Sequence, residues 1–201
     1  MTPVPFVEGA GVALPLASID TDQLIPARFM SRPRSEGYGG FLLHDLRRDA
    51  AGAPDPAFPL NAVADARVLV TRRNFGSGSS REAAVYALVD AGIGAVVAPS
   101  HGDIFASNAV KNGLVPVRVS DADCERLIAA LMASPGARVR VDVAAGRVLQ
   151  GDIDVPFTLD EVWREQLVNG WDDVDLTMAR AEDLARFRAA DARARPWARP
   201  A

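Results

Sequence analysis

Short apolar segments alternate with helix-like segments from Ala66 onward, and this alternation limits the chain to few architectures. A strand, then a helix, then a strand is the pattern of a sheet covered by helices. We therefore predict an α/β domain of three-layer or sandwich-like organisation. The expected strands are 67–71, 95–98 and 114–119, and the expected helices between them are 81–90 and 103–110.

The second half of the chain adds signals for two further helices and one hairpin. Residues 120–133 and 158–168 each open with Ser or Thr followed three positions later by an acidic residue, the form of a capping box, and we predict both as helices. Residues 138–143 and 147–150 flank an Ala-Ala-Gly turn and are predicted to pair as a hairpin.

The first third of the chain has less regular patterning. Residues 11–16 predict a short strand, and 19–22 (Ile-Asp-Thr-Asp) have the composition of a turn. Residues from about 31 to 60 are rich in glycine, charge and proline, so we expect a mobile loop, with a plain linker as the alternative. The C-terminal tail, about 189–201, is expected to be frayed.

Composition places the chain among ordinary single-domain proteins. It has 201 residues, 49% of them hydrophobic, which suffices for one core, so we expect one domain over residues 1–201. The net charge of -4 argues against nucleic-acid or anionic-membrane partners, which require a basic face. No apolar run approaches the length of a membrane span and no basic residue precedes Arg28. A cytoplasmic protein is the expectation.

The inventory of metal-binding side chains is small. Cys124 is the single cysteine, so neither an intrachain disulfide nor a cysteine-ligated cluster can form. His44 and His101 are the two histidines, and they do not have a metal-ligand spacing. We therefore predict no metal site in this chain.

The segment Asn74–Glu82 (Asn-Phe-Gly-Ser-Gly-Ser-Ser-Arg-Glu) is the richest in chemistry. Its two glycines allow backbone N–H groups to converge on an anion, and a helix N-terminus should follow. Arg81 adds a planar guanidinium that suits a carboxylate. The alternative is purely structural, because Ser79 followed by Glu82 also has the form of a helix capping box. The local residues leave both interpretations open.

The same segment resembles the signature of the aconitase-family swivelling domain, as found in small subunits of isopropylmalate dehydratases. The resemblance spans about Val12 to about Phe187 and implies a sandwich- or barrel-like β core flanked by helices. The matching segments, in chain order, are Ile-Asp-Thr-Asp-Gln-Leu-Ile-Pro at 19–26, Gly-Tyr-Gly-Gly-Phe-Leu at 37–42, the motif at 74–82, Asp-Ile-Phe at 103–105, Asn108, and Lys-Asn-Gly-Leu-Val-Pro at 111–116.

The resemblance also implies a reaction and a partner. Family members act with a larger subunit that carries a [4Fe–4S] cluster, and together they remove and re-add water on a small hydroxy-diacid. Isopropylmalate would place the reaction in leucine biosynthesis. By position in the motif, Ser79 is the expected base, and Gly78, Ser80 and Arg81 are expected to bind a substrate carboxylate.

Two further segments receive expected roles from the resemblance. Tyr38 and Gly39 lie in the loop that is expected to shape substrate choice. Asp20, Thr21 and Asp22 are candidates for supporting the active site, and a solvated turn is their structural alternative.

Two positions depart from the usual family motif. Ser77 stands where the bacterial enzymes often have Cys, and Ala83 where they often have His. These departures keep two alternatives open, namely a sister hydro-lyase acting on methylmalate/citraconate or dimethylmaleate, and a non-catalytic anion-binding module.

Overall fold

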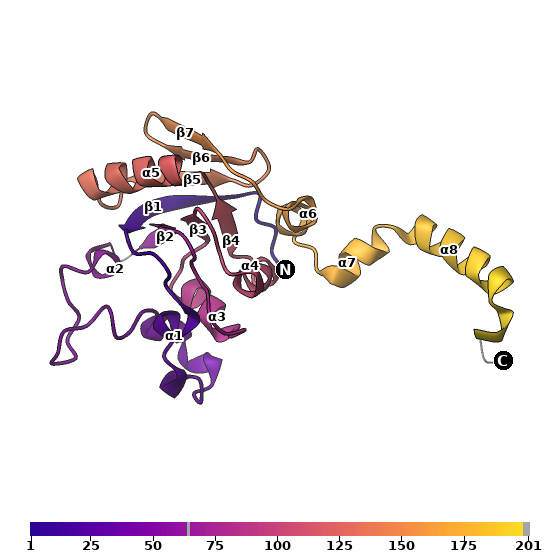
Figure 1. The fold of residues 1–201 in the computed structure, drawn as a ribbon, viewed down its shortest axis with the longest axis horizontal. Helices are drawn as coiled ribbons and strands as arrows, with labels where there is room; N and C mark the ends of the chain where they lie inside the picture. Colours follow the sequence, from indigo (N-terminus) through magenta and orange to yellow (C-terminus); the bar gives the residue numbers. More distant parts are fainter. Residues whose placement is uncertain (64, 199–201) are drawn as a thin grey trace.

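The computed structural model describes residues 1–63 and 65–198. Its centre is one mixed sheet of seven strands in the order β4-β3-β2-β1-β5-β6-β7 (Figure 1). Strands β1 to β4 pair in parallel, and β5 to β7 are added in antiparallel fashion. The strands are β1 (Phe6–Leu14), β2 (Ala66–Thr71), β3 (Ala95–Ala98), β4 (Val115–Arg118), β5 (Arg138–Asp142), β6 (Arg147–Gln150) and β7 (Ile153–Pro156).

Helices connect the parallel strands and cover the sheet. α3 joins β2 to β3, α4 joins β3 to β4, and α5 follows β4. The helices are α1 (Thr21–Leu24), α2 (Pro59–Ala62), α3 (Ala83–Asp90), α4 (Asp103–Lys111), α5 (Asp121–Ala133), α6 (Glu161–Asn169), α7 (Asp173–Met178) and α8 (Ala181–Ala194). Four 3-10 turns are η1 (Ala27–Phe29), η2 (Arg34–Glu36), η3 (Tyr38–Phe41) and η4 (Pro196–Ala198).

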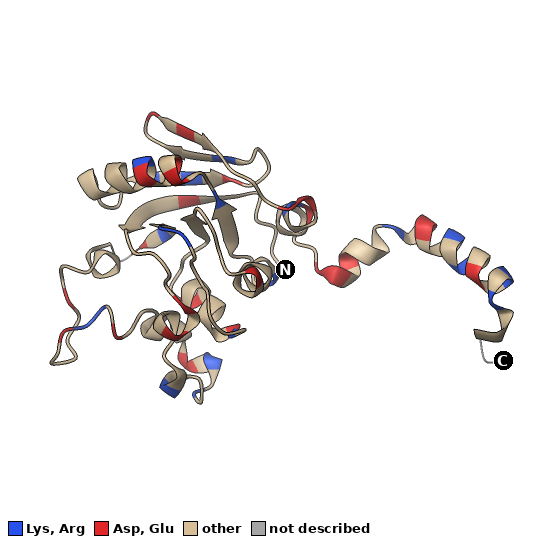
Figure 2. Cartoon of the chain, in the orientation of Figure 1, with Lys and Arg blue, Asp and Glu red and all other residues tan. Residues whose placement is uncertain are grey.

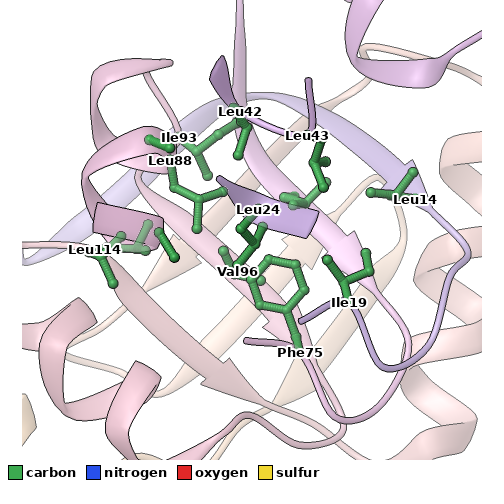
Figure 3. Packing of buried hydrophobic residues seen from close by; sticks show 14 of the residues in the cluster. Leu14, Ile19, Leu24, Leu42, Leu43, Phe75, Leu88, Ile93, Val96 and Leu114 are labelled. Atoms are coloured by element: carbon green, nitrogen blue, oxygen red, sulfur yellow. The ribbon is translucent and has the colours of Figure 1, made fainter. Parts of the chain in front are cut away.

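Both faces of the sheet are largely buried along β2, β3 and β4, because successive strand residues point to opposite sides and both sets are mainly apolar. In β3, Val96 belongs to one hydrophobic cluster and Val97 to the other. The first cluster includes Leu88 of α3, and Figure 3 shows it packed around Leu24. The second includes Leu127 of α5. Helices on both faces confirm the predicted α/β class, with one mixed sheet as the β core.

Most predicted elements are present, with shifted ends. The strand expected at 11–16 begins at Phe6, because its first residues pair with β5 across the sheet, from Phe6 with Asp142 to Ala10 with Arg138. The helix expected from Arg81 begins at Ala83. The helix expected from Thr158 is capped by Asp160, whose side chain accepts hydrogen bonds from the N–H groups of the first turn.

The segment 31–60 contains more packed structure than its composition suggests. Tyr38, Leu42 and Leu43 are buried, and the Tyr38 hydroxyl donates to the Arg32 carbonyl at 2.8 Å. The Tyr38 N–H donates to Asp90 Oδ2 at 3.1 Å, at the end of α3. The segment therefore packs despite its composition. That it moves as a loop stays a prediction.

The C-terminal region extends away from the sheet (Figure 1). Residues 189–194 complete α8, so fraying of the tail from residue 189 stays a prediction, and 199–201 lie outside the described residues. None of the residues of α8 is buried. Phe187 is 63% exposed and Trp197 is 78% exposed. Acidic and basic residues are interspersed along this helix (Figure 2), and charge pairs such as Arg186 with Asp183 support its helical form.

Candidate active site

The loops that follow β1 and β2 are fastened to each other at the carboxyl edge of the parallel strands. The Gly76 N–H donates to the Ile19 carbonyl at 2.7 Å, and the Thr21 N–H donates to the Ser77 carbonyl at 2.9 Å. Ligands of open α/β sheets bind at this edge, because the loops that follow neighbouring strands converge there. The segment 19–22, expected as a turn, contributes the start of α1.

A third loop, after β3, completes this arrangement. The Phe75 N–H donates to the Ser100 carbonyl at 3.1 Å, and the Gly102 N–H donates to the Phe75 carbonyl at 2.9 Å. The Asn74 N–H donates to Ser100 Oγ at 2.8 Å. Asn74 has a positive φ of 64°, so the chain turns sharply as it leaves β2. Residues far apart in sequence are thus held together mainly by backbone hydrogen bonds.

Two glycines permit this close approach. Gly76 has a φ of +70°, and a Cβ atom there would lie 2.3 Å from the Phe105 ring. A Cβ at Gly102 would lie 2.6 Å from the Gly76 carbonyl oxygen. Any side chain at either position would therefore force the loops apart. The glycines of the motif serve the packing of the loops as well as any ligand.

Ser79 is joined to Thr21 by two hydrogen bonds. The two hydroxyl oxygens are 2.9 Å apart, and the Ser79 N–H donates to Thr21 Oγ1 at 3.2 Å. Thr21 is 1% exposed, whereas Ser79 faces solvent. Because the Ser79 amide already donates to Thr21 Oγ1, the Thr21 hydroxyl proton is free to point at Ser79 Oγ.

Ser79 does not cap α3, so the capping-box interpretation of the motif is wrong. α3 begins at Ala83 with Glu82 as its N-cap residue, and no side chain caps it. The Glu82 carboxylate instead accepts a hydrogen bond from Asn112 Nδ2 at 2.8 Å. The serine hydroxyl is therefore committed to Thr21 at the loop edge.

Arg81 forms an ion pair with Asp22, which brings the two sequence motifs together at a second point. The Arg81 side chain is 23% exposed and that of Asp22 is 61% exposed. A mostly covered guanidinium with an exposed carboxylate partner can exchange that partner for a ligand carboxylate, because both offer the same planar pair of oxygens.

Three further predicted residues, Asp20, Gly78 and Ser80, lie at this edge of the sheet. Asp20 caps α1, accepting from the Gln23 N–H at 2.7 Å, so its role here is structural. Gly78 and Ser80 flank Ser79, and both are exposed.

The structure does not bring Tyr38 and Gly39 to Ser79. They pack at the C-terminal end of α3, where a Cβ at Gly39 would lie 2.6 Å from the Asp90 backbone. Ser79 and Arg81 precede the other end of this helix, about 12 Å away along its axis. Contact of Tyr38 or Gly39 with a ligand at Ser79 therefore stays a prediction that requires the loop to move.

His101 was not expected at this edge, but it lies beneath the motif. Its ring meets Phe75 edge-on, with centroids 6.4 Å apart, and its Nε2 lies 3.3 Å from the Val96 carbonyl oxygen. Burial lowers the pKa of His101 to about 4, so the imidazole is neutral at pH 7 and supports the loop through packing. The signal that was overlooked is Ser-His-Gly directly after an apolar strand, the position equivalent to the motif after β2.

The side chains that could ligate a metal ion or cluster are few and scattered in the described residues. Within residues 1–63 and 65–198, no three His, Cys, Asp or Glu side chains are arranged to hold a metal ion. Cys124 is buried, its thiol lies 3.1 Å from the Thr71 carbonyl oxygen, and burial raises its pKa to about 12. These residues do not fit a metal or cluster. In the same part of the chain, no helix is long and apolar enough to cross a bilayer.

Comparison with known proteins shows the family of the chain. The Aconitase C-terminal domain model matches residues 3–122. The chain is 40% identical to the 3-isopropylmalate dehydratase small subunit of Shouchella clausii over 189 residues, covering 93% of this chain and 95% of the relative. It is 45% identical to the small subunit of the same name from Anaeromyxobacter dehalogenans, covering 93% and 97%.

The chain belongs to the family of 3-isopropylmalate dehydratase small subunits. A solved structure of 3-isopropylmalate dehydratase from Methanocaldococcus jannaschii, 24% identical, shares the fold with a TM-score of 0.64, covering 90% of this chain and 99% of that one. The family assignment covers both segments that build the edge, around Thr21 and around Ser79.

Proposed function

We propose that this chain is the small subunit of a 3-isopropylmalate dehydratase, and that it interconverts 2- and 3-isopropylmalate in leucine biosynthesis together with a large subunit. The observation that carries the proposal is the joint presence of a Ser79–Thr21 hydroxyl pair and an exchangeable Arg81–Asp22 ion pair at one edge of the sheet. The names of the relatives support the same function.

Ser79 is the proposed base. It takes the proton from the carbon next to the one that bears the hydroxyl, and water is lost. When water re-adds at the deprotonated carbon, Ser79 returns a proton to the carbon that lost the hydroxyl. A serine is a weak base unless its oxyanion is stabilised. Thr21 supplies a hydroxyl within 2.9 Å, and Arg81 supplies positive charge two positions further along the chain.

Arg81 is proposed to bind one carboxylate of the diacid. In the structure, the Asp22 carboxylate forms an ion pair with the Arg81 guanidinium. Substrate binding would therefore replace the Asp22 carboxylate by a substrate carboxylate. Until then, Asp22 would keep the Arg81 guanidinium oriented.

The large subunit is proposed to carry a [4Fe–4S] cluster, because the donors of this chain do not fit one. When bound there, the cluster would supply Lewis-acid chemistry at the departing hydroxyl. The base and the carboxylate site of this chain face solvent, as required of groups that complete a site across an interface.

The alternatives differ in what they predict. A sister hydro-lyase would use the same Ser79 and Arg81 on methylmalate, whereas the relatives compared here carry the isopropylmalate name. A non-catalytic module would bind a diacid without turnover. The hydroxyl pair favours catalysis, because anion binding alone has no need for a Thr21–Ser79 contact.

Anaerobic reconstitution with the large subunit tests the proposal. The assembled enzyme should convert 2-isopropylmalate with a kcat/KM at least tenfold above that for methylmalate, and neither subunit alone should turn over. A reversed preference would select the sister enzyme. Diacid binding without turnover of either substrate by a cluster-loaded complex would select the binding module.

A further inference from the structure

A small cavity of about 180 Å³ lies between the loop 39–48 and the turn that precedes α2. Basic side chains line it, and no acidic residue is among its lining residues. It shares no residue with the Thr21–Ser79 and Asp22–Arg81 contacts, although Gly39 of the loop expected to shape substrate choice lines it. Its lining residues are Gly39, Gly40, Leu42, His44, Arg47, Arg48, Pro54 and Asn61.

Arg47 is the notable member of this lining. Its guanidinium is partly buried and donates to neutral oxygens, to Asn61 Oδ1 at 2.9 Å and to the Leu60 carbonyl at 3.4 Å. Burial lowers the pKa of Arg47, and the charge of Arg48 lowers it further. Among the described residues, neither arginine takes part in an ion pair with a carboxylate.

The nearby carboxylates are engaged elsewhere. Asp45 pairs with Arg28 and contacts His44. Asp49 accepts hydrogen bonds from the Ala51 and Ala53 N–H groups, both at 2.9 Å, and so closes the turn. Asp55 likewise accepts from the Ala57 N–H at 2.9 Å. These carboxylates keep their charge, but among the described residues none of them forms an ion pair with Arg47 or Arg48, so both guanidiniums can still bind an anionic ligand.

We propose that this cavity is a second ligand site, which binds a small oxyanion with two negative charges between Arg47 and Arg48. Two adjacent guanidiniums match a tetrahedral or dicarboxylate dianion through charge-assisted hydrogen bonds. The cavity volume admits inorganic phosphate or the end of a small diacid. Phosphate and a diacid share this chemistry, and titration with each of them distinguishes the two ligands.

The competing explanation is that Arg47 only fastens the loop to α2. Its bonds to Asn61 and Leu60 do fasten it, so Arg47 is unsuited to a clean test. Arg48 is better suited, because among the described residues its side chain makes a single hydrogen bond, to the Gly52 carbonyl at 2.8 Å. Arg67 is a matched control, since it also donates to a glycine carbonyl, that of Gly92, on another part of the surface.

Calorimetric titration of the full chain at low ionic strength, first with inorganic phosphate and then with 2-isopropylmalate, tests the site. Phosphate should bind one-to-one and saturably. Arg48→Gln should weaken that binding about tenfold or more, the scale of one hydrogen bond to a charged group. Arg67→Gln should leave it unchanged, and Arg48→Lys should fall between the two.

Three results would overturn the proposal, namely no saturable binding of either ligand by the unmodified chain, equal weakening by Arg48→Gln and Arg67→Gln, or unchanged binding in Arg48→Gln. If Arg48→Gln does not fold, amide shifts of the unmodified chain decide instead. Phosphate should then move the Gly39 and Gly40 signals, and shifts confined to other regions would count against the site.

Weakening of phosphate alone by Arg48→Gln would identify a phosphate-type site, and weakening of the diacid alone or of both would identify a dianion site open to diacids. The Arg81→Gln variant tests whether phosphate binds at the candidate active site instead. It should leave phosphate binding intact, because Arg81 lies outside the cavity. Loss of phosphate binding in Arg81→Gln equal to that in Arg48→Gln would also refute a separate site.

Discussion

Thr21 Oγ1 and Ser79 Oγ lie 2.9 Å apart, although 58 positions separate the two residues in the chain. If the Thr21 hydroxyl stabilises the Ser79 oxyanion, Thr21→Val should lower kcat of the assembled enzyme by about tenfold to a hundredfold, the range of one donor to a developing charge. KM should change little. Thr21→Ser keeps the hydroxyl and should retain most of the rate. Steady-state kinetics on both variants decides, and equal losses would indicate a packing role for the buried threonine.

Ser79→Ala should lower kcat about a hundredfold or more, as expected on removal of a proton-transfer group. Its free energy of unfolding should fall by only about 1 kcal/mol, through the lost hydrogen bond to Thr21, because Ser79 does not cap α3. Kinetics and chemical denaturation measure the two quantities. Ser134→Ala, an exposed serine at the end of α5, is the control. Normal turnover by folded, assembled Ser79→Ala enzyme would remove this serine from the mechanism.

Arg81→Lys should raise KM for the diacid about tenfold and lower kcat/KM at least as much, since lysine keeps the charge but loses the planar pair of donors. Cluster content and subunit assembly should be unaffected. Arg67→Lys is the control on a distant surface. An unchanged KM would show that the carboxylate is bound elsewhere.

His101 should make the fold sensitive to mild acid. Its pKa is about 4 in the folded chain and about 6.5 when exposed, so the unfolded chain binds a proton first as the pH falls. The depressed value means that stability is present above pH 6.5 and is lost towards pH 4, by about 3 kcal/mol. Urea denaturation at several pH values should show this slope in the unmodified chain, and a shallower slope in His101→Gln. Parallel slopes would exclude His101 as the cause.

Asp90 should control the opening of the loop that carries Tyr38. It accepts from the Tyr38 N–H and pairs with Arg34 at 2.9 Å, so Asp90→Asn weakens two contacts of the loop. Hydrogen exchange of amides 38–41 should become about tenfold faster, while exchange in β2 stays unchanged. Asp154→Asn, which removes a similar surface pair with Arg147, is the control. Equal exchange in both variants would show that Asp90 does not hold the loop.

The local elements were largely predictable because they depend on short-range periodicity. The strands at 67–71 and 95–98 and the helix at 103–110 follow from apolar spacing that tertiary contacts do not alter. The additional half of β1 was not predictable in this way, because Phe6 to Ala10 are extended through pairing with β5, more than a hundred residues later.

The sequence named candidate residues for the site but could not give their contacts. The motif and the family resemblance pointed to Ser79, Arg81 and the Asp20–Asp22 segment, but no local signal pairs Ser79 with Thr21 rather than with Glu82. That choice depends on how the loops after β1 and β2 meet. The position of Tyr38 could not be predicted for the same reason. It packs at the C-terminal end of α3, so the length of this helix sets its distance from Ser79.

The exposed course of α8 has a thermodynamic consequence. An isolated helix of this length is only marginally stable in water, because nucleation costs more than a few turns of hydrogen bonds return. With no buried residue to couple it to the sheet, α8 should melt and re-form on its own while the strands remain intact. The chain then has two levels of cooperativity, and a spectroscopic melting curve that follows helix content should begin well before the sheet unfolds.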